Sequence, residues 1–232
     1  MNMALRTARS PGPALNLNGY TDLPPGTVAA IVTYLEMTRR PRLRRIARPT
    51  GWSLERLSGD IGRYRALFRR VGEPWLWFSR LHLSDEDLAA IVDHPQVHAF
   101  ALHDGSSDIG ILELDFRSAG SCELGYFGLV PGAIGRGAGR YLMNEAIRRA
   151  FTAPIGRFFV HTCSLDHPAA LPFYMRSGFT PYKRAIEVAP DPRLAGRLPL
   201  KAAPHVPVLL GRPSGRSSRR TLRSTKPRAS RP

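Results

Sequence analysis

Four glycines stand within eight residues, where a strand-like run gives way to a helical one. They are Gly132, Gly135, Gly137 and Gly139. Glycine lets the backbone approach a ligand closely, and the N-terminus of the following helix offers unpaired N–H groups and roughly half a positive charge. Arg136 and Arg140 add cationic side chains. The pattern predicts a loop that binds phosphate or pyrophosphate, with a plain flexible turn as the alternative.

Two common phosphate-binding loops do not fit these residues. The dinucleotide fingerprint Gly-x-Gly-x-x-Gly fails because Arg140 stands where its third glycine would be. The Walker A loop fails because no Gly-Lys-Ser/Thr sequence occurs. The loop also follows an antiparallel strand pattern, rather than the first strand of a βαβ unit.

Hydrophobic periodicity predicts a mixed α/β layer around the loop. Three strands precede it and form an expected antiparallel meander, at residues 97–103, 109–116 and 122–130. The loop is followed by a helix, a strand, a second helix and a final strand, at residues 140–151, 157–163, 169–177 and 179–188. Farther upstream the patterns predict a strand, one or two helices and a helix capped by Ser84, at residues 27–37, 54–71 and 84–92.

The two ends of the chain differ in composition from its centre. Residues 211–232 hold eight Lys or Arg, no acidic residue and almost no large apolar residue. They cannot bury enough surface to offset the entropy lost on ordering, so we expect a disordered basic tail. Residues 1–24 are expected to form a flexible N-terminal segment that ends at a Pro-Pro-Gly turn. Residues 25–210 are then predicted to form one folded domain.

Composition favours a cytoplasmic protein with acidic ligands. No apolar run reaches the roughly 18 residues of a membrane span, and the N-terminal residues lack the apolar core of a secretory signal. Only two cysteines are present, too few to staple a chain of 232 residues. The net charge of +16 favours phosphate-bearing ligands or nucleic acid, and about half of the excess lies in the tail.

Two separate motifs resemble the GNAT superfamily of acetyl-CoA-dependent N-acetyltransferases. Residues 129–143 are similar to its acyl-CoA motif Arg/Gln-x-x-Gly-x-Gly/Ala, with Ile134 at the Arg/Gln position and Gly137 and Gly139 as the glycines. Residues 167–179 are similar to its closing motif Asn-x-x-Ala-x-x-x-Tyr-x-x-x-Gly-Phe, with His167 in place of asparagine and Tyr174 in register. The resemblance covers residues 95–188. It implies the GNAT fold, a mixed and mostly antiparallel central sheet flanked by helices.

The same resemblance implies acetyl-CoA as co-substrate and a set of residues that bind it. Those residues are Leu129, Val130, Ile134, Gly135, Arg136, Gly137, Ala138, Gly139, Arg140, His167 and Tyr174. The backbone of Leu129 and Val130 is expected to hold the thioester carbonyl and the pantetheine amides in the manner of a sheet.

The implied reaction is direct attack of a neutral amine on the thioester, which requires a base for the amine proton and an acid for the leaving thiolate. Tyr174 is the expected acid, although its place beside Phe173 also suits a core aromatic residue. Glu123, on the strand that leads into the loop, is similar in position to the glutamate base of the histone-acetyltransferase branch. Glu113 is the second candidate, a water chain is the third possibility, and any strand glutamate also suits an ion pair.

The sequence indicates only the general class of the binding partners. The acceptor is expected to be a small-molecule or peptide amine, and the protein a monomer or homodimer without membrane contact. The alternative is a basic nucleic-acid-binding protein whose GNAT domain only senses CoA, although no aromatic residue interleaves the tail arginines. No metal is expected, because His161 and Cys163 form only half a site and no Cys-x-x-Cys occurs.

Overall fold

The computed structural model describes residues 15–46 and 49–210. Within the expected N-terminal segment, residues 15–24 form no helix or strand. The rest of that segment and the predicted tail, residues 211–232, lie outside the described residues. None of the described helices is both long enough and apolar enough to cross a membrane.

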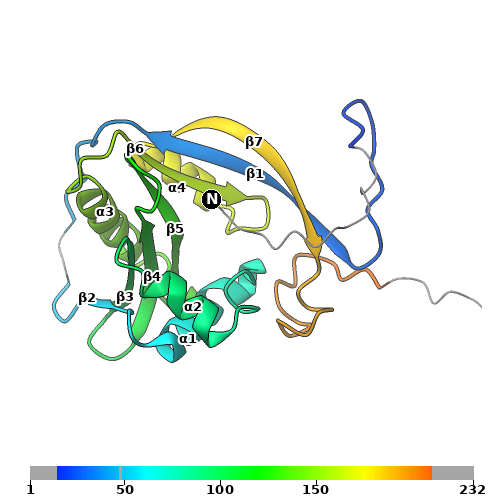
Figure 1. Ribbon diagram of the computed structural model, residues 1–232, viewed down its shortest axis with the longest axis horizontal. Coiled ribbons are helices and arrows are strands. Elements are labelled where there is room, and N and C mark those ends of the chain that lie inside the picture. The colour runs from blue at the N-terminus through cyan, green and yellow to red at the C-terminus, as the bar shows by residue number, and fades with distance from the viewer. Residues whose placement is uncertain (1–14, 47–48, 211–232) are drawn as a thin grey trace, which may run out of the picture.

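The described chain forms a seven-stranded sheet in the order β2-β3-β4-β5-β6-β1-β7 (Figure 1). The predicted meander is confirmed: β3 (Val97–His103), β4 (Asp108–Asp115) and β5 (Ser121–Leu129) are consecutive and antiparallel. β5 and β6 (Arg157–Cys163) are parallel. The expectation of a mixed and mostly antiparallel sheet is therefore confirmed.

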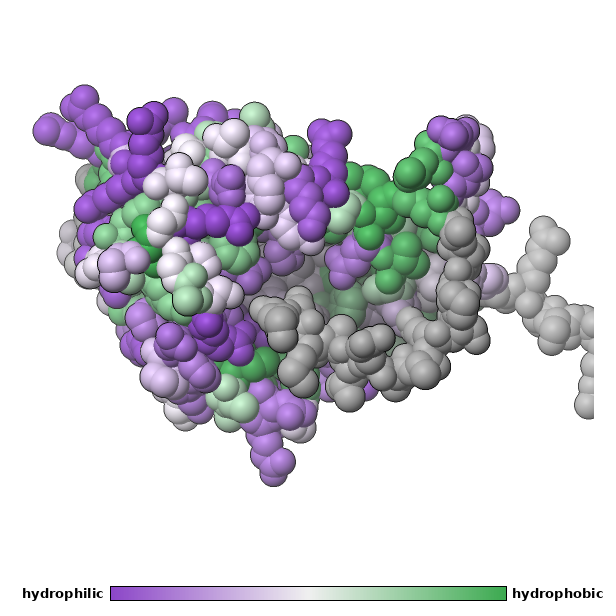
Figure 2. All heavy atoms as spheres, turned by 45° about the horizontal axis from the view of Figure 1, so that its top comes forward, coloured by the Kyte–Doolittle hydropathy of each residue, from purple (hydrophilic) through white to green (hydrophobic). Residues whose placement is uncertain are grey.

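The first strand of the chain lies between two of the last ones. β1 (Thr27–Met37) pairs in antiparallel fashion with β6 on one side and with β7 (Thr180–Pro190) on the other. Its residues before Val32 pair with β7 alone, so the two strands extend past β6 as a ribbon (Figure 1). Ile31, Ile186 and Val188 are exposed on this ribbon. Figure 2 shows a hydrophobic area at the right of the molecule.

One predicted helix begins later than the sequence pattern indicates. Ser53–Arg56 forms a short edge strand, β2, and the helix α1 covers only Ile61–Gly72. Leu54 and Leu57 have helical spacing relative to the apolar residues of α1, but Gly59 interrupts the pattern with a left-handed φ of +81°. Asp60 then caps α1, because its side chain accepts a hydrogen bond from the Arg63 N–H.

Helices cover both faces of the sheet. α3 (Ala138–Ala150) and α4 (Ala170–Ser177) contribute to one core, while α1 and α2 (Asp85–Val92) contribute to a second core that also includes Leu198 and Ala202 from the segment after β7. The predicted cap of α2 is confirmed, since the Ser84 hydroxyl accepts from the Asp87 N–H at 3.0 Å. On each helix, the residues that face the sheet recur at the apolar spacing seen in the sequence.

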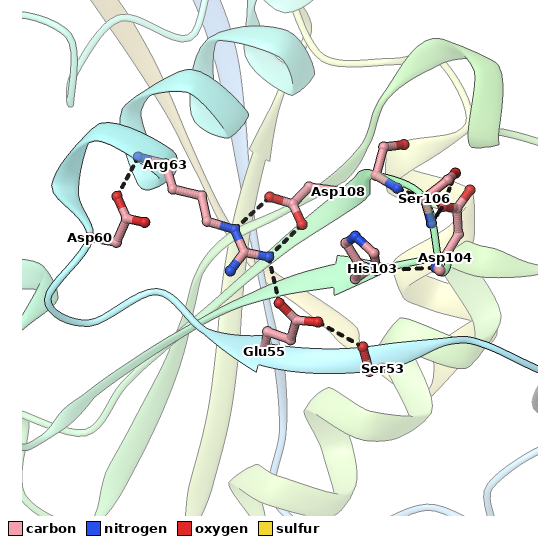
Figure 3. A network of polar contacts seen from close by, with 10 residues as sticks. Ser53, Glu55, Asp60, Arg63, His103, Asp104, Ser106 and Asp108 are labelled. Atoms are coloured by element: carbon pink, nitrogen blue, oxygen red, sulfur yellow. Dashed lines mark hydrogen bonds and ion pairs between the residues drawn. The ribbon is translucent and has the colours of Figure 1, made fainter.

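A polar network ties α1 to the β2 edge of the sheet (Figure 3). The Arg63 guanidinium donates to both carboxylate oxygens of Asp108, at 2.8 and 2.6 Å, and to Glu55 at 2.7 Å. These bonds hold the pKa of both carboxyl groups below their ordinary values. Paired and hydrogen-bonded in this way, the three side chains fasten the start of α1 to β2 and β4.

A second network lies buried between the sheet and α1. Glu113 on β4 is 1% exposed and accepts from the Tyr64 hydroxyl at 2.5 Å and from the Arg80 guanidinium at 2.6 Å. Arg80 also stacks on the Tyr126 ring at 5.1 Å, and the Tyr126 hydroxyl hydrogen-bonds to Ser79. Glu113 therefore links α1, β5 and the segment before α2 through one desolvated charge.

Removing that charge should destabilise the protein, because Arg80 would remain buried without its counter-ion. We expect Glu113→Gln to lower the free energy of unfolding by about 3 kcal/mol or more. Glu145→Gln is the control, since Glu145 pairs with the half-exposed Arg148 on α3. This substitution should lower the free energy of unfolding by less than about 1 kcal/mol. Urea denaturation of both variants gives the comparison, and equal losses would contradict the structural role of Glu113.

Candidate active site

The pairing between β5 and β6 stops after three residue pairs, the last of which joins Glu123 to Phe159. Beyond it β5 continues to Leu129 beside β4, while β6 continues to Cys163 beside β1. The two facing backbone edges therefore part, and their N–H and C=O groups lose the partners that an intact sheet supplies. Edges of this kind can pair with an extended ligand that carries amide groups.

A bulge at Gly125 accompanies the divergence. The register between β4 and β5 shifts between Glu113 and Leu114, which leaves Gly125 unpaired. A Cβ atom on Gly125 would lie 3.0 Å from Oε1 of Glu113, so the buried carboxylate uses space that glycine leaves open. A bulge increases the twist of its strand, and this one lies two residues past the last pair with β6.

The end of β5 presents its backbone in two directions. The Val130 N–H donates to the Ile109 carbonyl at 3.0 Å, and the Val130 carbonyl accepts from the Ala133 N–H at 3.0 Å. Because consecutive residues of a strand direct these groups to opposite sides, the N–H and C=O of Leu129 face the side of β6. We call this stretch, in which β5 and β6 no longer pair, the opening. Of the two expected backbone contacts, Leu129 is therefore well placed, whereas the Val130 N–H already has a partner.

The glycine loop forms a hollow at the N-terminus of α3. Gly135 and Gly137 have φ values of +82° and +85°, which favour glycine, and Gly137 is the N-cap of α3. A Cβ atom on Gly132 or Gly135 would meet nothing within 4 Å, so open space adjoins both. The next N–H groups, of Ala138, Gly139 and Arg140, start the helix and have no carbonyl of an earlier turn to bond. The first turn of α3 holds no acidic residue.

The side chains around this loop do not all point toward it. Arg136 and Ile134 are both exposed. Ile134 stands at the Arg/Gln position of the motif, which therefore offers only an apolar side chain. Arg140 stacks on the Phe173 ring at 4.9 Å and donates to the Ser177 hydroxyl at 3.0 Å. The guanidinium of Arg140 is therefore directed toward α4, whereas its backbone belongs to the helix N-terminus.

Two arginines that the sequence patterns did not single out line a cavity beside the loop. The cavity has a volume of about 490 Å³ and lies between Val130, Pro131 and Gly132 on one side and the end of α1 on the other. Arg69 and Arg70 line it from the last turn of α1. They fall within the helical pattern predicted at residues 54–71, and no motif includes them.

Tyr174 lies on α4, directly against β5. Its ring packs against Phe127, Phe173 and Phe179, and only 6% of the residue is exposed. Burial raises the pKa of the Tyr174 hydroxyl well above its ordinary value, so the group is neutral and carries its proton. None of the described residues hydrogen-bonds to this hydroxyl, in contrast to the buried Tyr64.

His167 occupies the asparagine position of the closing motif at the entrance to α4. Its Nδ1 accepts a hydrogen bond from the Ala169 N–H at 3.0 Å, and its ring lies 5.0 Å from Trp75. Trp75 also contacts His205, from the segment after β7, at 5.6 Å. Three segments that are distant in sequence thus form one aromatic group beside α4.

Glu123 is paired across the β5–β6 junction. Its Oε1 lies 3.5 Å from Nδ1 of His161, and both side chains are partly exposed, at 31% and 42%. The hydrogen bond to Glu123 raises the pKa of His161 above its ordinary value of 6.5. His161 entered the sequence reasoning only as half of a metal site, because nothing in the sequence indicates contact between residues 38 positions apart.

The two thiols lie in surroundings that keep them protonated. Burial raises the pKa of Cys163 to about 11 and that of Cys122 still further. Neither therefore presents a thiolate at neutral pH. Within residues 15–46 and 49–210, no three His, Cys, Asp or Glu side chains gather in a group that could hold a metal ion.

Comparison with known proteins places the chain in a family. A family model described as acetyltransferase (GNAT) family matches residues 64–179, half of the chain. A search of curated proteins found no match. Among solved structures, a GCN5-related N-acetyltransferase from Sphaerobacter thermophilus superposes with a TM-score of 0.52 at 13% identity, over 69% of this chain and 51% of that one.

Two further structures are similar at the same level. A Drosophila protein gives a TM-score of 0.53 at 15% identity over 71% and 52% of the two chains. A GNAT-family protein from Novosphingobium aromaticivorans gives 0.50 at 17% over 72% and 68%. The chain spans about half the length of the first two structures, and identities this low concern the fold alone. With the family model and the two motifs in register, the chain belongs to the acetyltransferase (GNAT) family.

Proposed function

We propose that the protein is an N-acetyltransferase that moves the acetyl group of acetyl-CoA onto a primary amine by direct attack. The observation that carries the proposal is the opening between β5 and β6, which ends at a glycine loop and the N-terminus of α3. A ligand that crosses this region can meet unpaired strand edges first and helix N–H groups next.

The described residues fit acetyl-CoA in its separate parts. The open space beside Gly132 and Gly135 leaves room for a pyrophosphate at the N–H groups that begin α3. The backbone of Leu129 faces the opening, where an extended pantetheine arm could accept and donate in the manner of a strand. When bound, the co-substrate supplies the activated acetyl thioester. This chain then has to hold the thioester, take up one proton and deliver another.

The proposed base is the pair formed by Glu123 and His161. The attacking amine must lose a proton as its nitrogen bonds to the thioester carbon, and the pair lies at the point where the opening begins. When the imidazole of His161 carries a proton on both nitrogens, it forms an ion pair with Glu123, and the pair cannot accept this proton. It becomes a base only as the pH rises through the elevated pKa of His161. Glu113 is reserved for a structural role, because both of its oxygens are occupied in the buried network.

The proposed acid is Tyr174. When the C–S bond breaks, the thiolate needs a proton, and the buried hydroxyl of Tyr174 retains its own at neutral pH. Transfer through a cysteine is not proposed, since burial keeps both thiols protonated.

The acceptor is proposed to be a small-molecule or peptide amine. The aromatic group of Trp75, His167 and His205 lies beside α4 and offers rings against which such an acceptor could pack. Release of CoA thiol, measured with acetyl-CoA across polyamines, aminoglycosides, amino acids, lysine peptides and protein N-termini, identifies the acceptor class. Absence of any amine-dependent CoA release, in a protein that binds acetyl-CoA, would contradict the proposed activity.

A valine at Gly135 should obstruct the proposed pyrophosphate site. Its side chain would occupy the open space beside the loop, and we expect the affinity for acetyl-CoA to fall by about tenfold or more in calorimetry. Gly196→Val is a matched control, because Gly196 also has a left-handed φ and nothing within 4 Å but lies far along the chain. Equal acetyl-CoA affinities in the two variants would remove the loop from the binding site.

The base pair should be visible in the pH dependence of kcat/KM. We expect the activity of the wild type to rise through a pKa above 6.5, because the acidic form of the pair cannot accept a proton. Glu123→Gln should lower turnover by about 100-fold at pH 7 and shift this limb to lower pH, since the carboxylate that raises the His161 pKa is gone.

His161→Gln separates the two members of the pair. If the imidazole is the group that titrates, this variant loses the limb above pH 6.5 altogether, along with about 100-fold in turnover at pH 7. If Glu123 and His161 variants both retain wild-type turnover at pH 7, the pair is not the base.

Tyr174→Phe should keep the packing of the ring and remove only the proton donor. We expect kcat to fall by about 100-fold with little change in acetyl-CoA affinity. Tyr141→Phe, which removes a hydroxyl from another buried tyrosine of the same core, should leave kcat unchanged. Wild-type turnover in Tyr174→Phe under conditions where chemistry is rate-limiting would assign this residue to the core alone.

A further inference from the structure

Four arginines converge on a groove beside the glycine loop. The segment that follows β1 lies against α3, and a cavity of about 110 Å³ lies between residues 41–44, the face of α3 from Arg140 to Ile147 and the end of α4. We call it the arginine groove, after the arginines that line it: Arg42, Arg44, Arg140 and Arg176. They come from three separate segments of the chain, so no run in the sequence indicates the site.

The segment after β1 is fixed in place by specific contacts. The Asn144 side chain donates to the Arg44 carbonyl at 2.7 Å. Leu43 and Ile46 pack against the core under α3, and Ile46 reaches the space beside Gly137. The segment therefore brings Arg42 and Arg44 to α3 within a turn or two of its N-terminus, rather than projecting as a free basic loop.

The described residues do not neutralise the positive charge of the groove. None of its four arginines forms an ion pair with a described residue, whereas Arg63, Arg80 and Arg193 all do. The undescribed segments contain no aspartate or glutamate that could serve instead. Burial, together with the nearby charges of Arg44 and Arg176, lowers the pKa of Arg140. Like charges held together at this cost mark a site for an anion.

The position of the groove indicates which anion it suits. Arg140 stands three residues into α3 from the N-cap, Gly137, and Asn144 stands one turn farther. CoA carries a pyrophosphate on the 5′ oxygen of its ribose and a phosphomonoester on the 3′ oxygen of the same ring. With the pyrophosphate at the helix N-terminus, the 3′-phosphate lies one ribose away. A phosphomonoester carries up to two negative charges on one small group. Guanidinium groups bind such a group better than an exposed apolar surface would.

We propose that the arginine groove binds the 3′-phosphate of CoA, and that this contact makes the enzyme selective for 3′-phosphorylated CoA over its dephosphorylated form. The inference rests on the proposed function, since it takes the pyrophosphate to lie at α3. It also accounts for the charge missing at one motif position: Ile134 offers no cation there, and the groove supplies positive charge from the segment after β1 and from α4.

Direct binding by calorimetry tests this without turnover. We expect wild-type protein to bind CoA at least about tenfold more tightly than 3′-dephospho-CoA, and to bind 3′,5′-ADP more tightly than 5′-AMP, as the loss of one charge-assisted hydrogen bond predicts. The double variant Arg44→Ala, Arg176→Ala should bind CoA only as well as dephospho-CoA, while its affinity for dephospho-CoA stays near the wild-type value. Arg45→Ala, which changes an exposed arginine of the same segment that does not line the groove, should keep the wild-type preference.

The possible outcomes distinguish the proposal for the arginine groove from the proposed acetyltransferase function. Equal binding of CoA and dephospho-CoA by wild-type protein overturns the groove and leaves the acetyltransferase proposal standing. A double variant that weakens both nucleotides equally also overturns it, because the arginines would then act as a general positive field. Failure of wild-type protein to bind any of these nucleotides overturns both proposals together.

Discussion

The early end of pairing between β5 and β6 is the constraint on which the rest of this structure depends. Where two neighbouring strands inside a sheet stop pairing, each must be held in place by the strand on its other side. Here β5 is held by β4 and by the buried Glu113 network at the Gly125 bulge, and β6 is held by β1. The opening, the glycine loop at its end and the N-terminus of α3 follow from that division.

Local patterns predicted the meander, the loop and α3 from the sequence, because apolar spacing and glycines act within a few residues. They failed at β2, where Leu54 and Leu57 imitate a helical repeat across the turn at Gly59. The insertion of β1 between β6 and β7 had no local signal, since strand order is decided by partners more than a hundred residues away.

The candidate site was predicted in part for the same reason. The loop residues and Tyr174 belong to motifs, so their register was readable. Glu113 and Glu123 look alike as strand carboxylates, and only the neighbours brought by folding distinguish them: Tyr64 and Arg80 bury the first, and His161 pairs with the second. The charge of the chain likewise indicated an acidic ligand, but the arginine groove draws on three segments and needed the fold to assemble it.

The position of β1 also determines when the molecule can be completed. Thr27–Met37 leaves the ribosome first among the strands, yet its partners are Arg157–Cys163 and Thr180–Pro190. At ordinary rates of synthesis, roughly ten seconds pass before even the nearer partner exists. During that interval the apolar face of β1 has no sheet to join, and the domain closes only when both ends of the chain are present. Long-range closure of this kind slows folding, and it leaves the edges of β1 unpaired and exposed to aggregation until both partner strands have been made.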